Sequence, residues 1–332
     1  MKSIVTGGAG FVGSHLCERL VKEGHKVLIL DNFSLGKKNN LKNIRNKVKM
    51  VKRDIRDLKS INNLFKGAHN VFHLAALADI VPSIENPDEY YNTNVTGTYN
   101  VLKASINNKV KRFIYTASSS CYGIPNKFPT KETSEISPQY PYALTKRLGE
   151  ELVIHFANIY NLNATSLRLF NVYGPRARTS GNYGAVFGVF LAQKIAKKPF
   201  TIVGDGTQTR DFTFVSDVTE AMLKVQKKSN LKGSIFNVGS GETVSVNKIA
   251  KELGGKKKRI PKRPGEPDVT FADISKIKRK TGWKPKISIK EGIKVMLSNL
   301  DDWKSAPVWT PKKISKETKK WFFYLGSKKN KN

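Results

Sequence analysis

The chain of 332 residues is short of cysteine and of acidic residues, and it has no long apolar run. Cys17 and Cys121 are its only cysteines, which excludes a disulfide framework and any zinc site built mainly from thiolates, and fits a reducing compartment. No segment approaches the roughly 20 consecutive apolar residues that a membrane helix needs, and Met1 leads straight into a strand-like run. We therefore expect a cytoplasmic protein with no membrane insertion and no metal site.

Acidic residues are outnumbered, because 26 Asp and Glu stand against 59 Lys and Arg and leave a formal net charge of +33. Such a charge first suggests a nucleic-acid partner. However, Lys42, Lys103, Lys194 and Lys224 illustrate how the lysines are spread along the chain, whereas nucleic-acid modules concentrate charge and interleave aromatics. We expect no specific nucleic-acid binding, a field that favours an anionic small substrate, and a solvated tail over Ser327–Asn332.

Apolar, strand-like runs alternate with helix-length segments in the first half of the chain. The predicted strands are Lys2–Val5, Lys26–Leu30, Val48–Lys52, Asn70–Leu74, Arg112–Thr116 and Thr165–Leu169. Such alternation is typical of a parallel sheet with right-handed crossovers. Helices are predicted over Glu89–Asn107 and Tyr142–Tyr160, long enough to cover one face of the sheet together or to form a dimer interface.

Glycine and proline interrupt this pattern after Phe170, for example in Gly174-Pro175. The change indicates a smaller, loop-rich lobe over the sheet. Arg210–Val225 and Ser234–Val238 are regular enough to return to the large domain. We predict a first domain over residues 1–170 with 211–240, a second lobe over 171–210 and 241–300, and a C-terminal extension with a basic tail over 301–332.

The segment Thr6–Gly13, Thr-Gly-Gly-Ala-Gly-Phe-Val-Gly, joins the first predicted strand to a helix predicted over Ser14–Val21. Gly7 permits a tight turn, Gly10 lets the backbone approach phosphates, and Gly13 lets the helix pack against the strand. The unpaired N–H groups at the start of the helix can hold a pyrophosphate. The spacing predicts a dinucleotide-binding turn, although an ordinary strand-to-helix loop can share it.

Carboxylates follow the second and third predicted strands. Asp31 lies about 20 residues after the glycine turn, where it can accept both hydroxyls of an adenosine ribose. Because it would repel a 2′-phosphate, Asp31 favours NAD over NADP, although Lys37 and Lys38 weaken that exclusion. Asp54-Ile55 could hold an adenine ring, with the apolar side chain against the ring and the carboxylate on its amino group.

Tyr142 and Lys146 are four residues apart, which places them on one face of a helix. A free tyrosine is almost wholly protonated at pH 7, so its use as a base needs a nearby cation, which Lys146 supplies. Ser118, at the end of the fifth strand, can hydrogen-bond a substrate oxygen and orient proton transfer to Tyr142. Alternatively, Tyr142 and Lys146 are an exposed pair on a helix with no catalytic role. The order along the chain, with the glycine turn first, then Ser118 and then the Tyr/Lys pair, argues against this alternative.

These motifs resemble the extended short-chain dehydrogenases/reductases, and within them the nucleotide-sugar 4-epimerases related to UDP-hexose and UDP-N-acetylhexosamine epimerases. The resemblance covers nearly the whole chain. It implies a Rossmann-type, doubly wound parallel sheet with a smaller C-terminal substrate-binding α/β lobe, an NAD cofactor and a homodimer joined by a four-helix bundle. Further matching segments are His73–Ala76, Asn94–Thr98, Asn171–Pro175, Arg210–Phe212 and Arg263–Glu266.

The resemblance also implies roles for individual residues. The catalytic residues would be Ser118, Tyr142 and Lys146. The cofactor-binding residues would be Gly7, Gly10, Phe11, Val12, Gly13, Asp31, Asn32, Asp54, Ile55, Leu74, Ala75, Ala76, Asn94, Tyr142, Lys146 and Phe170. The residues that bind the UDP-sugar would be Ser83, Ser118, Ser119, Asn171, Ala185, Val186, Thr201, Arg210, Arg263, Glu266 and Thr270. The two arginines suit a diphosphate because each offers forked donors.

Three positions bear on the reaction. Related 4,6-dehydratases carry an Asp-Glu pair where this chain has Ser119 and Ser120, so elimination loses its acid and base. Thr270 stands where glucose-restricted relatives carry a bulky aromatic, which leaves room for an N-acetyl group. We expect a 4-epimerase with a transient 4-keto sugar; UDP-glucuronate decarboxylases and epimerases stay open, as does a non-catalytic NAD-binding scaffold.

The segment from Asn299 to Leu325 extends beyond the recognisable core and carries Trp303, Trp309 and Trp321. Large aromatic rings at such positions usually bury apolar area. We therefore expect these three rings to be packing anchors and not a ligand cage.

Overall fold

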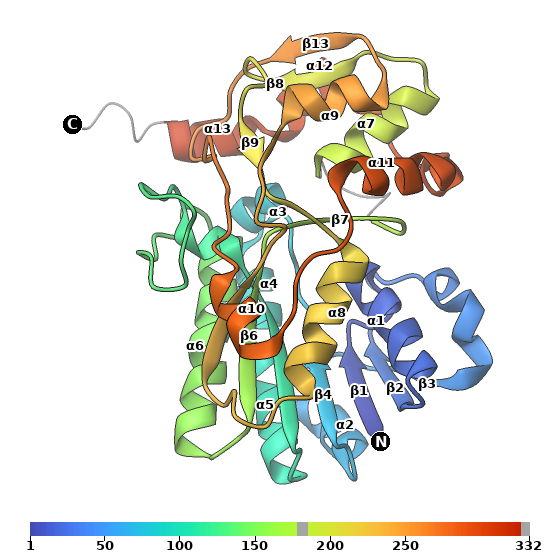
Figure 1. Cartoon of the computed structure of the whole chain (residues 1–332), viewed down its shortest axis with the longest axis vertical. Coiled ribbons are helices and arrows are strands. Elements are labelled where there is room, and N and C mark those ends of the chain that lie inside the picture. Colours follow the sequence, from blue (N-terminus) through green and yellow to red (C-terminus); the bar gives the residue numbers. More distant parts are fainter. Residues whose placement is uncertain (178–184, 327–332) are drawn as a thin grey trace.

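The computed structural model describes residues 1–177 and 185–326, so the predicted tail over Ser327–Asn332 lies outside the described residues. Its centre is a seven-stranded parallel sheet in the order β11-β6-β5-β4-β1-β2-β3 (Figure 1). This order confirms the predicted doubly wound sheet. The strands are β1 (Lys2–Thr6), β2 (Lys26–Asp31), β3 (Val48–Lys52), β4 (Asn70–His73), β5 (Arg112–Ser118), β6 (Ala164–Leu169) and β11 (Ser234–Val238).

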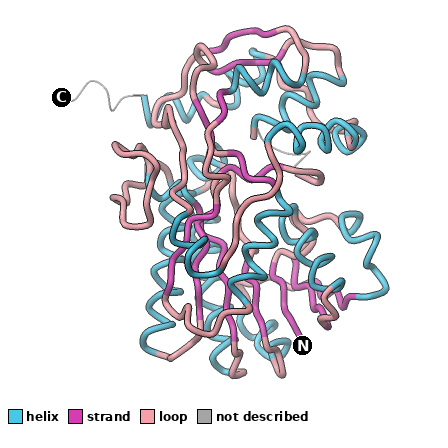
Figure 2. Tube along the Cα trace, viewed as in Figure 1, coloured by secondary structure: helices cyan, strands magenta, loops and turns pink. Residues whose placement is uncertain are grey.

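Helices cover both faces of this sheet, as Figure 2 shows. One layer contains α1 (Phe11–Lys22) and α8 (Val215–Gln226), and the other contains α2 (Leu58–Asn62), α5 (Gly97–Asn107) and α6 (Pro141–Ile159). Neighbouring strand residues alternate between the layers, since Val5 packs in the α1 layer and Ile4 in the α5 layer. Both faces are buried, which explains why the strands read as continuous apolar runs.

The second lobe is built from helices and pairs of short strands with a separate apolar core. β8 (Phe200–Val203) pairs with β13 (Lys257–Ile260), β9 (Thr209–Arg210) with β12 (Val244–Ser245), and β7 (Asn171–Tyr173) with β10 (Phe212–Phe214). The later helices are α7 (Val186–Ile195), α9 (Val246–Leu253), α10 (Ser275–Thr281), α11 (Ile289–Ser298), α12 (Pro311–Glu317) and α13 (Lys319–Gly326). Most of these helices lie in the upper lobe of Figure 1, whereas α10 packs against β11 of the sheet.

Short helical turns complete the connections: η1 (Lys38–Lys47), η2 (Asn63–Phe65), α3 (Ile80–Glu85), α4 (Pro87–Tyr91), η3 (Asn92–Thr96), η4 (Ser119–Tyr122) and η5 (Leu300–Trp303). Two predicted helices differ from the structure. The first begins at Phe11, three residues before the predicted start, and therefore includes Gly13. The helix predicted over Glu89–Asn107 is divided, because η3 is a π-helical turn between α4 and α5.

The C-terminal extension packs against the rest of the chain. Trp303 and Trp321 are each 1% exposed and Trp309 is partly buried, so the three rings pack as predicted, although Trp309 and Trp321 also line a cavity. Trp303 joins the core of the second lobe together with Ile314 of α12. Within the described ranges, none of the helices is both long and apolar enough to span a membrane.

Candidate functional site

A cavity of about 990 Å³ lies between the sheet and the second lobe, a volume suited to a large organic ligand. The residues at or just after the carboxyl ends of six strands line it: Gly7, Asp31, Asp54, Leu74, Ser118 and Phe170. In doubly wound sheets this edge, next to the change of strand order at β1 and β4, is where ligands bind. The cavity also reaches Arg210 and Arg263 of the second lobe.

The glycine turn is closed toward the protein and open toward the cavity. Gly7 has φ +69°, and a Cβ there would lie 2.7 Å from the amide nitrogen of Ala75. A Cβ on Gly13 would lie 2.2 Å from the Gly7 carbonyl oxygen. At Gly10, which lines the cavity, a Cβ would meet only the Gly7 carbonyl oxygen within 4 Å. The turn and the start of α1 therefore leave space where a dinucleotide pyrophosphate fits.

Asp31 faces the same end of the cavity and also stabilises the turn. Its two carboxylate oxygens accept the N–H groups of Ala9 at 2.9 Å and Phe33 at 2.8 Å. Burial raises the pKa of Asp31, and these backbone hydrogen bonds oppose the rise. Nearby, the Asp54 carboxylate accepts the Arg56 guanidinium and the Asn32 amide, which lower its pKa to about 2. Asp31 and Asp54 thus both place carboxylate oxygens, which accept hydrogen bonds, in the part of the cavity predicted to hold the adenosine of NAD.

Ser118, Tyr142 and Lys146 all line the cavity, Ser118 from the end of β5 and the other two from α6. Burial raises the pKa of the Tyr142 phenol, and a hydrogen bond from Ser118 opposes it. Burial lowers the pKa of Lys146 to about 7, and the charge of Glu150 opposes this shift. The Lys146 ammonium lies 4.3 Å from the centre of the Tyr115 ring. Tyr142, which can act as an acid or base, and Lys146, which can carry a positive charge, therefore lie about one turn apart on the same face of α6.

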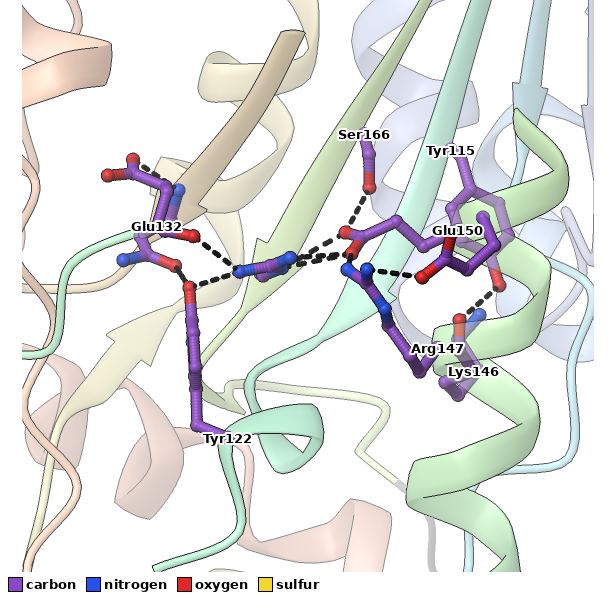
Figure 3. Close-up of polar contacts among 10 residues, drawn as sticks. Tyr115, Tyr122, Glu132, Lys146, Arg147, Glu150 and Ser166 are labelled. Atoms are coloured by element: carbon purple, nitrogen blue, oxygen red, sulfur yellow. Dashed lines mark hydrogen bonds and ion pairs between the residues drawn. The ribbon is translucent and has the colours of Figure 1, made fainter. Parts of the chain in front are cut away.

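Behind this cluster, buried charges tie α6 to the sheet (Figure 3). Glu150, one turn after Lys146, accepts hydrogen bonds from Arg147, Arg168 and the Ser166 hydroxyl. Arg168 of β6 also donates to the Tyr122 hydroxyl at 2.7 Å. Because these partners come from β6 and η4, the network fixes the rotation of α6 and with it the face that carries Tyr142 and Lys146.

The far end of the cavity carries positive charge. Arg210 and Arg263 both line it, with Glu266 3.4 Å from Arg263 as the nearby acid. Burial lowers the pKa of Arg210, the Glu266 charge opposes this, and the Arg263 charge adds to it. Asp268 also acts on Arg210 but pairs with Lys262 at 2.6 Å, so the two guanidinium groups keep an excess positive charge that suits an anion such as a diphosphate.

The predicted substrate residues Asn171 and Thr270 lie on the wall of this end. The Thr270 hydroxyl donates to the Asn171 amide oxygen at 2.9 Å and accepts the Asp211 N–H. Thr201 also lines the cavity, but it is 4% exposed and its hydroxyl accepts the Gln193 amide. The Thr201 side chain therefore stabilises the wall of the cavity, and little of it is available to a ligand.

Two predicted site residues do not line the cavity, and the structure corrects their assignment. Ser83 is fully buried in α3 and its hydroxyl donates to the Ile80 carbonyl at 2.6 Å. Asn94 is fully buried in η3, where its amide oxygen accepts the Leu77 N–H and its amide group donates to Leu77 and Thr145. With their polar atoms used inside the protein, both residues support the wall. All the other predicted site residues line the cavity.

Sequence reasoning missed many of the residues that line the cavity, among them Tyr140, Arg176 and Trp321. Tyr140 lies parallel to Tyr142, with ring centres 6.4 Å apart. Arg176 follows the Gly174-Pro175 turn and pairs with Glu18 of α1 at 2.7 Å. Tyr140 could have been found because it lies two residues before Tyr142, and Arg176 because it directly follows a Gly-Pro turn. Trp321 is far along the chain from every motif, so no local signal points to it.

A sequence model of the family described as GDP-mannose 4,6 dehydratase matches residues 4–296. The chain is 34% identical to a UDP-glucose 4-epimerase of Mycolicibacterium smegmatis, over 88% of this chain and 96% of that protein. It is also 34% identical to a UDP-N-acetyl-alpha-D-glucosaminuronate decarboxylase of Bacillus cytotoxicus, over 88% of this chain and 95% of that protein. The sequence is thus similar to enzymes of more than one reaction type.

Solved structures of 4-epimerases that act on different UDP-sugars are also similar to this chain. The UDP-glucose 4-epimerase of Thermotoga maritima with UDP-glucose is 35% identical, with a TM-score of 0.85 over 91% of this chain and 99% of that one. The UDP-N-acetylglucosamine 4-epimerase of Methanobrevibacter ruminantium, in complex with UDP-N-acetylmuramic acid, is 32% identical, with a TM-score of 0.84 over 90% and 98%. The UDP-glucuronic acid 4-epimerase of Bacillus cereus, with UDP-glucuronic acid and NAD, is 31% identical, with a TM-score of 0.83 over 91% and 99%.

Proposed function

Because the chain belongs to the NAD-dependent epimerase/dehydratase family of extended short-chain dehydrogenases/reductases, we propose that it is a 4-epimerase of UDP-sugars. NAD is its cofactor. The observation that carries the proposal is that one cavity is lined both by the Tyr142/Lys146 pair and by Arg210 with Arg263. A proton-transfer group and a diphosphate anchor then act on the two ends of one substrate. In this assignment residues 1–170 and 211–240 hold NAD, and residues 171–210 and 241–300 hold the sugar nucleotide.

The proposed mechanism is a proton transfer coupled to reversible oxidation at C4 of the sugar. The glycine turn and Asp31 would hold NAD, which would supply a reversible hydride acceptor for C4. Tyr142 removes the C4 hydroxyl proton and later gives it back, and the charged form of Lys146 would oppose the burial that raises the pKa of Tyr142. Ser118, which hydrogen-bonds Tyr142, would hold the same sugar oxygen. Arg210 and Arg263 keep the diphosphate in place while the 4-keto sugar turns, so no net oxidation or reduction results.

The residues next to Ser118 favour epimerisation over dehydration. A 4,6-dehydratase needs a carboxylic acid and a carboxylate beside the hexose to eliminate water. Ser119 and Ser120 occupy those positions and line the cavity, and the Ser120 hydroxyl lies 2.8 Å from that of Ser118. A serine hydroxyl is too weak an acid and base at neutral pH for that step, so the proposal departs from the dehydratase in the family's description.

A second candidate is decarboxylation of a UDP-uronic acid, whereas 4-epimerisation of such an acid falls under the first proposal. The decarboxylase of Bacillus cytotoxicus, 34% identical to this chain, favours it. The two candidates share the oxidation at C4 and differ in the group at C5. Decarboxylation releases carbon dioxide after the 4-keto sugar forms, whereas 4-epimerisation keeps every carbon atom.

The deciding experiment incubates the purified protein with a panel of UDP-, dTDP- and GDP-sugars that includes UDP-glucose, UDP-N-acetylglucosamine and their uronic acids. NMR of the products identifies reaction and substrate together. We expect inversion at C4 of UDP-sugars, with UDP-N-acetylglucosamine or its uronic acid used at least as well as UDP-glucose. Release of carbon dioxide would favour the second candidate, and activity on UDP-glucose alone would contradict the role of Thr270.

The variant Tyr142→Phe separates an enzyme from an NAD-binding scaffold. We expect it to keep its NAD content and to lose turnover by about three orders of magnitude, as removal of a proton-transfer group does. Tyr160→Phe is the matched control, because it removes the hydroxyl of a 52% exposed tyrosine at the end of α6, and it should keep wild-type turnover. Undiminished turnover of Tyr142→Phe would exclude Tyr142 as the base.

A further inference from the structure

The C-terminal helix α13 lies on the left of the upper lobe in Figure 1 and packs against α3. It follows residue 296, where the match to the family model ends. Trp321 of this helix is 1% exposed and lines the cavity. A segment outside the matched family core therefore forms part of the wall of the proposed substrate site.

On one side, α13 holds the loop Arg263–Glu266 of the second lobe. The Trp321 indole N–H donates to the Pro264 carbonyl at 2.8 Å. The Arg263 guanidinium lies over the indole, 5.3 Å from the ring centre. Leu325 reaches the same loop, since its Cδ1 is 3.5 Å from where a Cβ on Gly265 would stand. Three successive loop residues are thus placed by one helix.

On the other side, α13 contacts the sheet domain. It packs against α3, and the Lys320 ammonium lies 3.9 Å from the Glu85 carboxylate. The Trp321 ring is also 6.4 Å from the ring of Tyr140, which lies parallel to the ring of Tyr142. Trp321 therefore connects the arginine end of the cavity with the Tyr142 end.

We propose that α13 joins the two lobes across the cavity and that Trp321 is a positioning residue for Arg263, holding its guanidinium ready for the diphosphate of the substrate. A guanidinium stacked on an aromatic face keeps its N–H donors in the plane of the group, at its edges. Those edges are the part that a diphosphate needs for forked hydrogen bonds. The buried indole restricts the rotamers of Arg263 before substrate arrives, which lowers the entropy lost on binding. This inference rests on the proposed function, because it assumes that Arg263 binds the diphosphate.

The experiment compares Trp321→Ala, Trp321→Phe and wild type, each purified with NAD, by calorimetric titration with UDP. We expect Trp321→Ala to bind UDP about tenfold more weakly, because both the indole hydrogen bond and the stacking are lost. Trp321→Phe, which keeps a ring under Arg263 but lacks the N–H, should fall between the two. With substrate, KM should rise while kcat changes little, since Arg263 holds the diphosphate and not the reacting carbon.

Phe323→Ala is the matched control, because Phe323 is an aromatic residue of the same helix with 71% exposure. It should bind UDP as wild type does. Hydrogen exchange of the amides at Gly265 and Glu266, measured without UDP, provides a second readout and should become faster only in the Trp321 variants.

Unchanged UDP affinity in Trp321→Phe and Trp321→Ala, together with unchanged exchange at Gly265, would overturn the inference and leave the proposed function standing. A wild-type protein that binds no UDP would contradict the proposed function instead. Loss of NAD content in Trp321→Ala would identify a general folding defect, and the decision then rests on Trp321→Phe, whose larger side chain fills most of the same space.

Discussion

Glu150 and Arg168 form an ion pair closed off from solvent, with side-chain exposures of 1% and 2% and a closest N–O distance of 2.7 Å. Both carboxylate oxygens of Glu150 accept from Arg168 Nε at 3.1 Å. Burying two charges is costly unless their geometry and remaining hydrogen bonds are good, and here Ser166, Arg147 and Tyr122 supply those bonds (Figure 3). The pair is therefore sensitive to the loss of either partner.

We expect Glu150→Gln to lower the free energy of unfolding by about 3 kcal/mol, because it leaves the Arg168 charge buried without its carboxylate. Urea unfolding followed by circular dichroism measures this change. Glu151→Gln is the control: Glu151 also pairs with Arg147, but its side chain is 58% exposed, so the loss should stay below about 1 kcal/mol. Equal losses in the two variants would contradict the role assigned to the buried pair.

The sheet could be predicted closely from the sequence, because most of its strands are buried and read as apolar runs; only the edge strand β3 is partly exposed along its whole length. Val48–Lys52 and Ser234–Val238 match β3 and β11 residue for residue. The order of the site motifs also follows from the fold, since the carboxyl ends of parallel strands meet at one edge. Asp31 and Ser118 accordingly line one cavity although 87 residues separate them in sequence.

Helix rotation and long-range contacts could not be predicted in the same way. Ser83 belongs to a six-residue helix whose Ile80 and Val81 line the cavity, and only the rotation of that helix turns Ser83 away. Asn94 sits in a π-helical turn that no periodicity signals. The Trp321 ring was expected to pack, which it does, but its place over Arg263 depends on the path of the C-terminal extension.

The buried Lys146 should make stability depend on pH. Its pKa is about 7 in the folded protein, against an ordinary value of 10.5. Between these values the unfolded chain holds a proton that the folded protein has released, so raising the pH stabilises the folded state. We expect the free energy of unfolding of NAD-free wild type, relative to Lys146→Met, to rise by about 2 kcal/mol from pH 7 to pH 9.

Urea unfolding of wild type and Lys146→Met at both pH values measures this difference, since the variant lacks the titrating group and shares the others. Lys103→Met, which changes an exposed lysine of α5, serves as the control and should follow wild type at both values. If the difference in the free energy of unfolding between wild type and Lys146→Met stays constant from pH 7 to pH 9, the folded and unfolded states hold the same number of protons on Lys146, which contradicts the prediction.

The exposed apolar residues of α4, α5 and α6 predict a homodimer. Tyr91 is 51% exposed, Tyr99 42% and Leu144 48%, and all three lie on the helices predicted to form a four-helix bundle with a second copy. We expect wild type to sediment as a dimer at micromolar concentration and Leu144→Glu to shift toward monomer. Val295→Glu, on α11 of the other lobe and 37% exposed, should leave the dimer unchanged. A monomeric wild type would refute the prediction.

Substrate choice should respond to the size of the side chain at position 270. The Thr270 hydroxyl forms hydrogen bonds with Asn171 and Asp211. Any large replacement breaks these bonds and should lower the activity on both UDP-glucose and UDP-N-acetylglucosamine. The informative quantity is therefore the ratio of the kcat/KM values of the two substrates. We expect Thr270→Tyr to lower this ratio for the N-acetyl sugar by about tenfold or more, because an aromatic ring fills the space for the acetyl group. Thr270→Val, which removes the hydroxyl and keeps the volume, should weaken both substrates alike and leave the ratio near that of wild type. If Thr270→Tyr also leaves the ratio unchanged, the N-acetyl group lies elsewhere in the cavity, and Thr270 only holds Asn171 in place.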